Sequence, residues 1–471
     1  MSAPVIFITT LAEYQTVFWL EVAAELKRTG AQVRFISFDD RSTEAIGDAG
    51  FRVHACAKDA LVRPIDPVAL DTLCKRLGIR HFNRWLAHER ITFAIRDSGA
   101  LAARFAAYVE MVEQAFSEAA VEAAAEGARP VLVQELGGFV SVVASYFAAR
   151  ARGVDNWFIE PSFFRGRQFF IRNSFAAKRI ALDPTAEPSP AVREYLANTL
   201  DTRAIVIPLK DRHHYTSVAR KIVNRRNVKR LFEKVVDKHL HGKHQEFGHI
   251  GHHVSQHTRM LVNSMRTRSL ARPLEGIGRF VYYPLHVPAD MALTLRSPQF
   301  LDQLALVDYI ARSIPTTHKL AIKEHPAQIG ALPAERLAGL LERYDNVVLL
   351  TPQTNNFHVL QATDAVVSVN SKSGAEAMLL GKPVLVIGDA FYRDAPLVTR
   401  VERLDDLPAL IEAAVAGERR VSPEDPAIGR YFESVWRETL PGELYSSAPQ
   451  NVVSFARSVI EVLRAPLAVA A

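Results

Sequence analysis

Two polar loops in the second half of the chain carry residues suited to binding a phosphate. Residues 319–326 (KLAIKEHP) end an apolar run on a lysine and a histidine, and residues 367–384 lead from an apolar run directly into a predicted helix. The free N–H groups and the positive dipole end of a helix start favour an anion. Ligands of open α/β sheets bind at the carboxyl ends of the strands. The two loops therefore predict a nucleotide-sugar site.

Within these loops, His325 and the two serines are the clearest candidates for phosphate contacts. His325 follows a predicted strand, and both ring nitrogens donate when the imidazole is charged; the alternative is a turn histidine bonded to the backbone. Ser373 and Glu376 also fit a capping box, and Glu376 could instead bind a ribose hydroxyl. The predicted nucleotide-sugar-binding residues are Lys323, His325, Pro326, Asn370, Ser371, Ser373, Gly374 and Glu376.

Three carboxylates near the ends of predicted strands are candidates for catalysis. Asp290 lies a few residues beyond a strand. Glycosyl transfer with retention needs a carboxylate opposite the leaving group, and transfer with inversion needs a base for the acceptor hydroxyl; the alternative is an aspartate of a helix start or a loop. Glu135 and Glu160 each end an apolar strand in the first half, where burial would raise the carboxyl pKa for proton transfer. Arg165 and Arg167 are candidates to bind an acidic sugar, although single arginines are often solvated.

The elements that must position these residues alternate between short apolar runs and helical patterns. This alternation predicts parallel sheets covered on both faces. Three prolines at 184, 188 and 190 break this pattern and mark a boundary or a surface connection. The predicted strands are 5–9, 32–38, 52–56, 130–134 and 156–159 in the first half, and 280–284, 319–323, 347–350, 365–369 and 384–387 in the second.

The predicted fold class is therefore α/β, with two Rossmann-like domains, a cleft between them and a basic helical insertion. We place the first Rossmann-like domain, on the acceptor side, at residues 1–204 and the insertion at 205–275. The second, nucleotide-sugar-binding domain covers 276–420, and a helical segment at 421–471 packs back on the first. A chain of 471 residues is too long for one ordinary core, which agrees with this division.

Composition excludes several classes of protein. No apolar run is long enough for a membrane helix, and the start of the chain lacks the basic region of a signal peptide. Two cysteines form no disulfide framework, so we expect a cytoplasmic protein. The first strand is followed by no Gly-x-Gly-x-x-Gly turn, and no phosphate-binding P-loop sequence occurs. No cluster has metal-ligand spacing, so neither a catalytic metal nor a cofactor is predicted.

The insertion at 205–275 is strongly basic. It holds 15 Lys and Arg against 5 Asp and Glu, together with 9 of the 16 histidines. A basic helix gains roughly 1 kcal/mol for each Lys or Arg near an anionic membrane. We therefore expect peripheral contact with the inner face of the membrane, for example through Arg225, Arg226, Lys229 and Arg230, the alternative being a solvated insertion. Few aromatic residues interrupt the charges, which disfavours nucleic acid.

Several motifs together resemble those of the capsule polysaccharide biosynthesis family, whose characterised members include β-Kdo transferases. Each motif alone is weak, but the set is fairly specific, and it covers roughly 280–400 well and 130–175 in part. The matching pieces are Tyr283-Pro284-Leu285-His286 with Asp290, Lys323-Glu324-His325-Pro326, residues 370–377, Gly381-Lys382-Pro383-Val384 with Tyr392, and Phe158-Ile159-Glu160-Pro161 with the aromatic residues that follow.

The resemblance implies a GT-B glycosyltransferase that moves Kdo, or a related acidic sugar, from a CMP donor to a growing surface glycan or glycolipid. It implies that the second domain holds the nucleotide and that Asp290 is the nucleophile of a retaining reaction. Glu160 matches the family loop better than Glu135 as the acid/base. One alternative is a transferase or epimerase that uses a UDP, GDP or TDP sugar. Another is a non-catalytic factor that binds polysaccharide or membrane.

Overall fold

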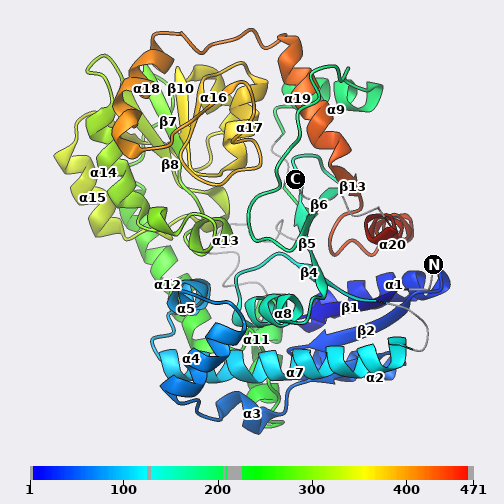
Figure 1. Ribbon diagram of the computed structural model, residues 1–471. Helices are drawn as coiled ribbons and strands as arrows, with labels where there is room; N and C mark the ends of the chain where they lie inside the picture. Colours follow the sequence, from blue (N-terminus) through cyan, green and yellow to red (C-terminus); the bar gives the residue numbers. More distant parts are fainter. Residues whose placement is uncertain (1–3, 125–128, 205–206, 210–224, 465–471) are drawn as a thin grey trace.

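The computed structural model describes residues 4–124, 129–204, 207–209 and 225–464, which form two α/β domains (Figure 1). The first sheet has the strand order β13-β6-β5-β4-β1-β2-β3 and the second the order β12-β11-β10-β7-β8-β9. This architecture confirms the predicted α/β class with two Rossmann-like domains in a GT-B-like layout. The first-sheet strands are β1 (Val5–Thr10), β2 (Gln32–Ser37), β3 (Arg52–Ala55), β4 (Pro130–Glu135), β5 (Asp155–Pro161), β6 (Arg167–Arg172) and β13 (Thr439–Pro441).

The first sheet is parallel from β3 to β5 and antiparallel at β6 and β13. Successive side chains of a strand point to opposite faces. Accordingly, Ile6 and Ile8 belong to the core beneath α1 and α20, whereas Val5 and Phe7 belong to the core that contains α7 and α8. The helices are α1 (Glu13–Arg28), α2 (Asp40–Asp48), α3 (Lys58–Val62), α4 (Pro67–Arg76), α5 (Phe82–Trp85), α6 (Ala87–Phe93), α7 (Ser98–Ala124), α8 (Val140–Ala151) and α9 (Pro190–Thr202).

The second sheet is parallel throughout. One face packs on α14, α15 and α18, and the other packs on α16 and α17. Its strands are β7 (Phe280–Pro284), β8 (Lys319–Lys323), β9 (Val347–Leu349), β10 (Ala365–Ser368), β11 (Val384–Val386) and β12 (Val398–Arg400). Its helices are α13 (Met291–Thr294), α14 (Gln303–Ser313), α15 (Ala334–Arg343), α16 (Asn356–Ala362), α17 (Lys372–Leu379) and α18 (Leu407–Val415).

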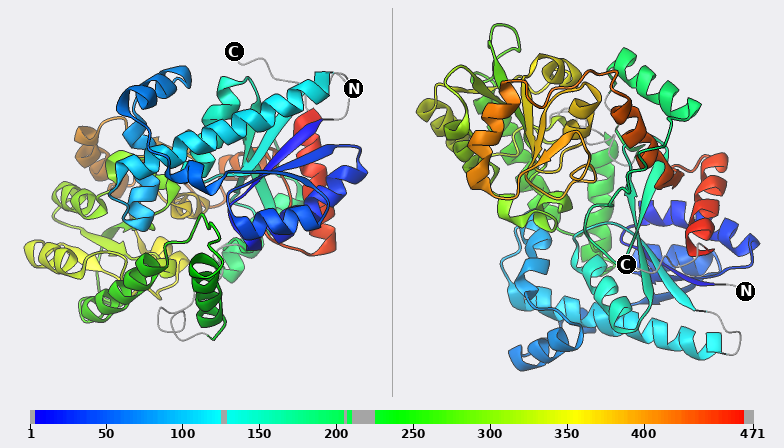
Figure 2. Two further views of the ribbon diagram at one scale, coloured as in Figure 1. Left: turned by 90° about the horizontal axis from the view of Figure 1, so that it is seen from below. Right: turned by 45° about the horizontal axis from the view of Figure 1, so that its top comes forward.

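The end of the chain returns to the first domain. Helix α19 (Pro426–Arg437) contacts α9, and β13 pairs with β6 to extend the first sheet. Helix α20 (Pro449–Arg464) lies beside α1, as both views in Figure 2 show. Phe455 of α20 packs against Phe18 and Trp19 of α1, with ring centroids 5.1 and 5.6 Å apart. The last strand and helix are thus structural parts of the first domain.

The basic insertion bridges the two domains. His244 lies between α11 (Arg225–His239) and α12 (Ile250–Thr267). Its backbone N–H donates to the Asp40 carboxylate of the first domain at 2.8 Å, and its backbone carbonyl accepts from the Asp40 N–H at 3.0 Å. Helix α12 packs on α15, and its Asn263 donates to the Gly330 carbonyl of the second domain at 3.0 Å. The side chains of Arg225, Arg226, Lys229 and Arg230 lie outside the described residues.

Within the described ranges, no helix is both long enough and apolar enough to cross a membrane.

Candidate active site

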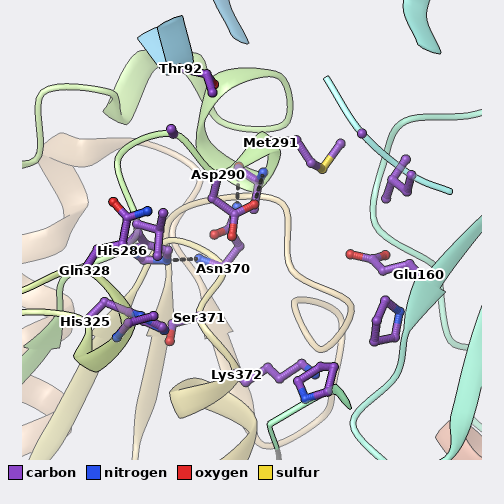
Figure 3. A pocket seen from close by; sticks show the side chains of 18 of the residues that line it. Thr92, Glu160, His286, Asp290, Met291, His325, Gln328, Asn370, Ser371 and Lys372 are labelled. Atoms are coloured by element: carbon purple, nitrogen blue, oxygen red, sulfur yellow. Dashed lines mark hydrogen bonds between the residues drawn. The ribbon is translucent and has the colours of Figure 1, made fainter. Parts of the chain in front are cut away.

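A cavity of about 1050 Å³ lies between the two domains. Both sheets contribute the carboxyl ends of their strands to its lining, including Glu135, Glu160 and Lys323. Loops and helix starts of the second domain supply Asp290 and Ser371 (Figure 3). The structure therefore brings the predicted catalytic carboxylates and most of the predicted nucleotide-binding residues into one space, although their chemical roles remain predictions.

The start of α17 is capped by Ser371, whose hydroxyl accepts from the Ser373 N–H at 3.2 Å. Both serines line the cavity, so hydroxyl groups and a helix start face it together. The expected capping box between Ser373 and Glu376 is wrong. The helix begins two residues earlier than that pattern requires, and the Glu376 carboxylate is bonded elsewhere.

Glu376 belongs to a buried polar network on the cavity wall. The side-chain amide of Asn356 donates to the Glu376 carboxylate at 2.6 Å and to the Ser373 hydroxyl at 3.0 Å. The Tyr282 hydroxyl in turn donates to the side-chain amide oxygen of Asn356, Oδ1, at 3.1 Å. Burial raises the pKa of Glu376, and the bond from Asn356 opposes this shift. The network fixes the Ser373 hydroxyl at the start of α17.

Gly374 does not line the cavity. A Cβ at this position would lie 2.3 Å from the Tyr392 hydroxyl oxygen. That hydroxyl bonds to the Ser371 carbonyl and, at 3.0 Å, to the Ser368 hydroxyl. We therefore correct its predicted role: the glycine admits Tyr392 against the helix, and no phosphate contact is expected of it.

Lys323 and His325 lie on the cavity wall at the end of β8. The Lys323 ammonium donates to the Thr354 carbonyl at 2.9 Å, and burial lowers the pKa of this lysine to about 8. The Nδ1 atom of His325 accepts from the Ala327 N–H at 3.3 Å, at the start of the short turn Pro326–Gln328. In the neutral ring Nε2 is then the protonated atom, which can donate to a phosphate oxygen.

Glu324, between these two residues, is a cavity residue that the sequence analysis did not single out. Its side chain is buried and accepts a hydrogen bond from the Gly330 N–H at 2.9 Å. Burial raises the pKa of Glu324 to about 7. Its place in the Lys-Glu-His-Pro motif was the available signal, since a carboxylate beside a lysine and a histidine is the residue type expected at a reactive site.

Asp290 is exposed to the cavity and caps α13, accepting from the Ala292 N–H at 2.9 Å. Asn370 holds this turn by donating to the Ala292 carbonyl at 2.6 Å (Figure 3). Beside them, His286 accepts from the Asn370 N–H at 3.4 Å, and burial lowers the pKa of His286 to about 3. A neutral imidazole thus lies beside the turn that carries Asp290.

Glu160 forms a two-pronged ion pair with Arg296 across the domain boundary, with N–O distances of 2.7 and 2.9 Å. The Arg296 side chain is only 5% exposed and also donates to the Phe175 carbonyl at 2.8 Å. Burial lowers the pKa of Arg296, whereas the Glu160 carboxylate raises it. The net shift of this pKa is upward. Both oxygens of the Glu160 carboxylate are thus occupied by a buried cation that joins the two domains, which disfavours Glu160 as the acid/base.

Glu135 has different partners. Gln15 donates to its carboxylate at 3.3 Å, and the Tyr445 hydroxyl donates to the same oxygen. Tyr445 lies between β13 and α20, so a residue from the end of the chain completes this part of the cavity. Neither Gln15 nor Tyr445 was predicted, because nothing in their local sequence links them to Glu135.

The predicted sugar contacts Arg165 and Arg167 do not line the cavity, which corrects that expectation. Arg167 donates to the Thr439 hydroxyl at 2.8 Å and lies 3.9 Å above the Trp436 ring, so it anchors the returning chain. Arg165 is exposed and donates from its backbone N–H to the Tyr195 hydroxyl at 2.9 Å. Two other cationic side chains line the cavity: Lys372 at the start of α17 and Arg296 in the loop after α13.

His88 joins the first domain to α13 and also lines the cavity. Its Nδ1 atom lies 2.9 Å from the Thr294 hydroxyl, and burial lowers the pKa of His88 to about 4. Gly138 makes room for the ring, because a Cβ there would lie 2.5 Å from it. His88 was not predicted, since its importance depends on a contact 206 residues away.

Among the described residues no group of three or more His, Cys, Asp and Glu side chains is arranged to hold a metal ion. His213 and His214 lie outside those residues.

Comparison with known families identifies the chain's relatives. The profile of a family described as "Capsule polysaccharide biosynthesis protein" matches residues 142–406, which is more than half of the chain. The chain belongs to the capsule polysaccharide biosynthesis family. The matched region includes Glu160, Asp290, the Lys-Glu-His-Pro loop and the start of α17, so the family resemblance and the cavity concern the same residues.

Among individual proteins, "Protein FixF" of Sinorhizobium fredii is 27% identical over 184 residues, which cover 39% of this chain and 43% of that protein. This chain therefore matches less than half of that relative's length. A KpsC "beta Kdo 2,7 transferase" of Thermosulfurimonas dismutans aligns over 96% of this chain and 99% of its own, at 12% identity and a TM-score of 0.36. MurG of Acinetobacter baumannii aligns over 97% and 99%, at 10% identity and a TM-score of 0.31.

Proposed function

We propose that this member of the family is a glycosyltransferase of surface polysaccharide synthesis. The supporting observation is that Asp290, Glu135, His325 and the capped start of α17 share one cavity between two Rossmann-like domains. A nucleotide-sugar enzyme needs an anion site, a group that reacts at the sugar carbon and room for a second substrate. The cavity offers a candidate for each of these three requirements.

On the donor side, the second domain would hold the nucleotide phosphate. The start of α17 offers N–H groups and the Ser371 and Ser373 hydroxyls, while Lys323 and His325 offer further donors. Such preorganised donors stabilise the negative charge that develops on a leaving phosphate. We propose a CMP-activated acidic sugar, Kdo or a close relative, as the donor; this finer identity comes from the family resemblance.

For the reaction we propose two displacements at the sugar carbon. The Asp290 carboxylate would attack that carbon while its bond to the CMP oxygen breaks, and CMP would leave with the electron pair. An acceptor hydroxyl would then attack the same carbon, releasing Asp290 and giving its proton to a base. We assign this base to Glu135, since Glu160 is paired with Arg296. Two inversions would give overall retention.

We further propose that the protein works at the inner face of an anionic membrane. Segment 205–275 carries a large excess of Lys and Arg. Its described part exposes six large apolar side chains: Phe232, Val235, Leu240, Val254, Val262 and Met265. Basic charge together with exposed apolar residues favours an interfacial position. Cosedimentation with phosphatidylglycerol vesicles at low salt, lost at high salt, is the expected result; binding to neutral vesicles alone would contradict it.

The function is tested by a thermal-shift panel of CMP, CDP, UDP, GDP and TDP, with and without EDTA. A ligand at about 100 times its Kd adds roughly 2.7 kcal/mol of apparent stability. We expect a selective shift with CMP that EDTA leaves unchanged, and CMP release from CMP-Kdo that Asp290→Asn abolishes. A shift with UDP, GDP or TDP would point to another donor or an epimerase. No shift with any nucleotide would favour a non-catalytic binding protein.

A further inference from the structure

A second wall of the cavity differs in its side chains from the wall that carries the proposed donor site and reacting carboxylates. It is made by the first domain together with the insertion and consists of aromatic and uncharged polar side chains. Its members are Phe93, Phe139, Phe247, His253, Gln256 and His257. We call this set the aromatic–histidine wall.

The rings of the wall are packed against one another. Phe93 stacks on His249 with ring centroids 4.2 Å apart and an interplanar angle of 28°. Phe139 contacts Phe247 at 4.7 Å, and His253 meets Phe93 edge-on at 5.7 Å. Because these residues come from α6, the start of α8, the α11–α12 loop and α12, the insertion completes a surface that the first domain alone leaves open.

Hydrogen-bonding groups of the wall are mostly uncharged. Burial lowers the pKa of His253 to about 4, so this imidazole is neutral at physiological pH. His257 bonds through Nδ1 to the His253 carbonyl at 2.7 Å, so its Nε2 is the ring atom that can bond to a ligand hydroxyl. Gln256 adds an amide that both donates and accepts. Among its described side chains, the insertion contributes one cation to the cavity, Lys234.

The wall adjoins the proposed reaction centre. His88 contacts the Phe139 ring at 4.6 Å and lies 2.9 Å from the hydroxyl of Thr294, on the helix that Asp290 caps. Thr92, which precedes Phe93 of the wall, lines the same cavity as Asp290. A molecule resting on the wall would therefore lie close to the proposed nucleophile.

Aromatic faces flanked by neutral donors and acceptors suit one class of ligand in particular. The C–H face of a pyranose packs on aromatic rings, while its hydroxyls bond to imidazole and amide groups. An anion would require more cations than the single lysine, and a lipid chain would leave the imidazoles and the amide without partners. We propose that the aromatic–histidine wall is an acceptor subsite for an uncharged pyranose residue, and that the insertion selects this residue.

Calling this subsite the acceptor site depends on the proposed transferase function, but sugar binding itself can be tested without activity. The test is saturation-transfer NMR of the full chain with methyl β-D-glucopyranoside, methyl β-D-galactopyranoside, methyl β-D-glucuronide and octyl β-D-glucopyranoside. We expect saturation of the ring protons of at least one neutral methyl glycoside and a weaker signal from the glucuronide. The double variant His253→Ala, His257→Ala should lower that saturation at least fivefold.

Ser255→Ala, exposed on the same helix, is the matched control and should keep the full signal. The single variant His257→Asn, which keeps hydrogen-bonding groups, reports on the wall if the double variant unfolds, and we expect a partial loss. Unchanged saturation in both histidine variants, preference for the glucuronide, or saturation confined to the octyl chain would overturn the proposal. Failure of the CMP thermal shift with intact glycoside binding would instead reject the transferase function and leave the sugar subsite standing.

Discussion

Glu135 and Glu160 face the same cavity but have different partners, and this difference decides their chemistry. Glu160 is bound by both terminal nitrogens of the buried Arg296, whereas Glu135 accepts from the uncharged groups of Gln15 and Tyr445. An adjacent guanidinium stabilises the ionised form of a carboxylate, while neutral donors do so less strongly. We therefore expect Glu160 to hold the domains together and Glu135 to move protons.

The two carboxylates should respond differently to replacement by glutamine. Glu160→Gln leaves Arg296 buried without its counter-charge, and we expect a loss of about 2–3 kcal/mol of stability. Glu135→Gln keeps an oxygen for Tyr445 and should unfold near the wild-type temperature, but its kcat should fall at least about 100-fold. Thermal unfolding and CMP release from CMP-Kdo measure the two effects.

A double variant that replaces both members of the Glu160–Arg296 ion pair is the control for the stability effect. In Glu160→Gln, Arg296→Met no charge remains unpaired, so part of the lost stability should return. An active Glu135→Gln enzyme, together with an inactive but stable Glu160→Gln enzyme, would reverse the two assignments.

Lys323 predicts how nucleotide binding depends on pH. Burial lowers the pKa of this lysine to about 8, so the free protein loses the positive charge as pH rises through that value. If the phosphate binds only to the charged form, the Kd for CMP should rise up to about fivefold between pH 8 and pH 9. Isothermal titration at several pH values measures this, and Lys323→Arg should bind independently of pH over the range. A flat profile in the wild type would remove Lys323 from the phosphate site.

At the scale of elements, helix α17 has two roles. The residues at its start line the cavity, and a residue along its side packs closely against Tyr392. Ser371 and Ser373 face the cavity, while Gly374 lies against Tyr392. The same short helix therefore depends on a small residue at one position and on hydroxyls at its neighbours. The sequence motif alone does not separate these two requirements.

Gly374→Ala should destabilise the protein by about 1–3 kcal/mol, because the new methyl group would lie 2.3 Å from the Tyr392 hydroxyl oxygen. Thermal or urea unfolding measures the loss. Removing only the hydroxyl, in Gly374→Ala, Tyr392→Phe, should not restore stability, because ring carbons Cζ and Cε2 would still lie 2.5 and 2.6 Å from the added carbon. Gly339→Ala in α15 is the matched control: nothing lies within 4 Å of the added group, and alanine should stabilise that helix by up to about 1 kcal/mol. Equal effects at both glycines would contradict the packing argument.

At the scale of the whole molecule, the chain closes on itself. Its last helix completes the core beneath β1, and the α11–α12 loop bonds to α2 near the start of the chain. A single hydrophobic cluster includes α7 and α8 of the first domain and α17 of the second. The two domains and the returning segment are therefore expected to stabilise one another.

Phe455→Ala tests this closure. Phe455 is fully buried between Phe18 and Trp19, and its removal should cost about 3–5 kcal/mol. Hydrogen exchange should show the amides of α1 losing protection, although they lie more than 400 residues away in sequence. Arg457→Ala, exposed on the same helix, should change neither quantity. Loss of protection confined to α20 would argue against a shared core.

Much of the fold could be predicted because it depends on local pattern. The apolar runs of β1, β4, β7 and β8 lie within a residue or two of their predicted positions, since burial on both faces requires continuous apolar sequence. Strand β6 was missed, although Phe169, Phe170 and Ile171 form an apolar run. Its antiparallel pairing with β5 breaks the strand–helix alternation on which the prediction relied.

The sequence by itself determined where the site would be, because polar residues after buried strands must collect at the carboxyl edges of the sheets. Tertiary structure alone decided which side chains meet there. The contacts of Glu160 with Arg296, Glu135 with Tyr445 and His88 with Thr294 join residues 136, 310 and 206 positions apart. Local periodicity carries no information about such pairs, since they form only when separately folded elements pack. The same packing turned a basic segment of the sequence into one wall of the cavity.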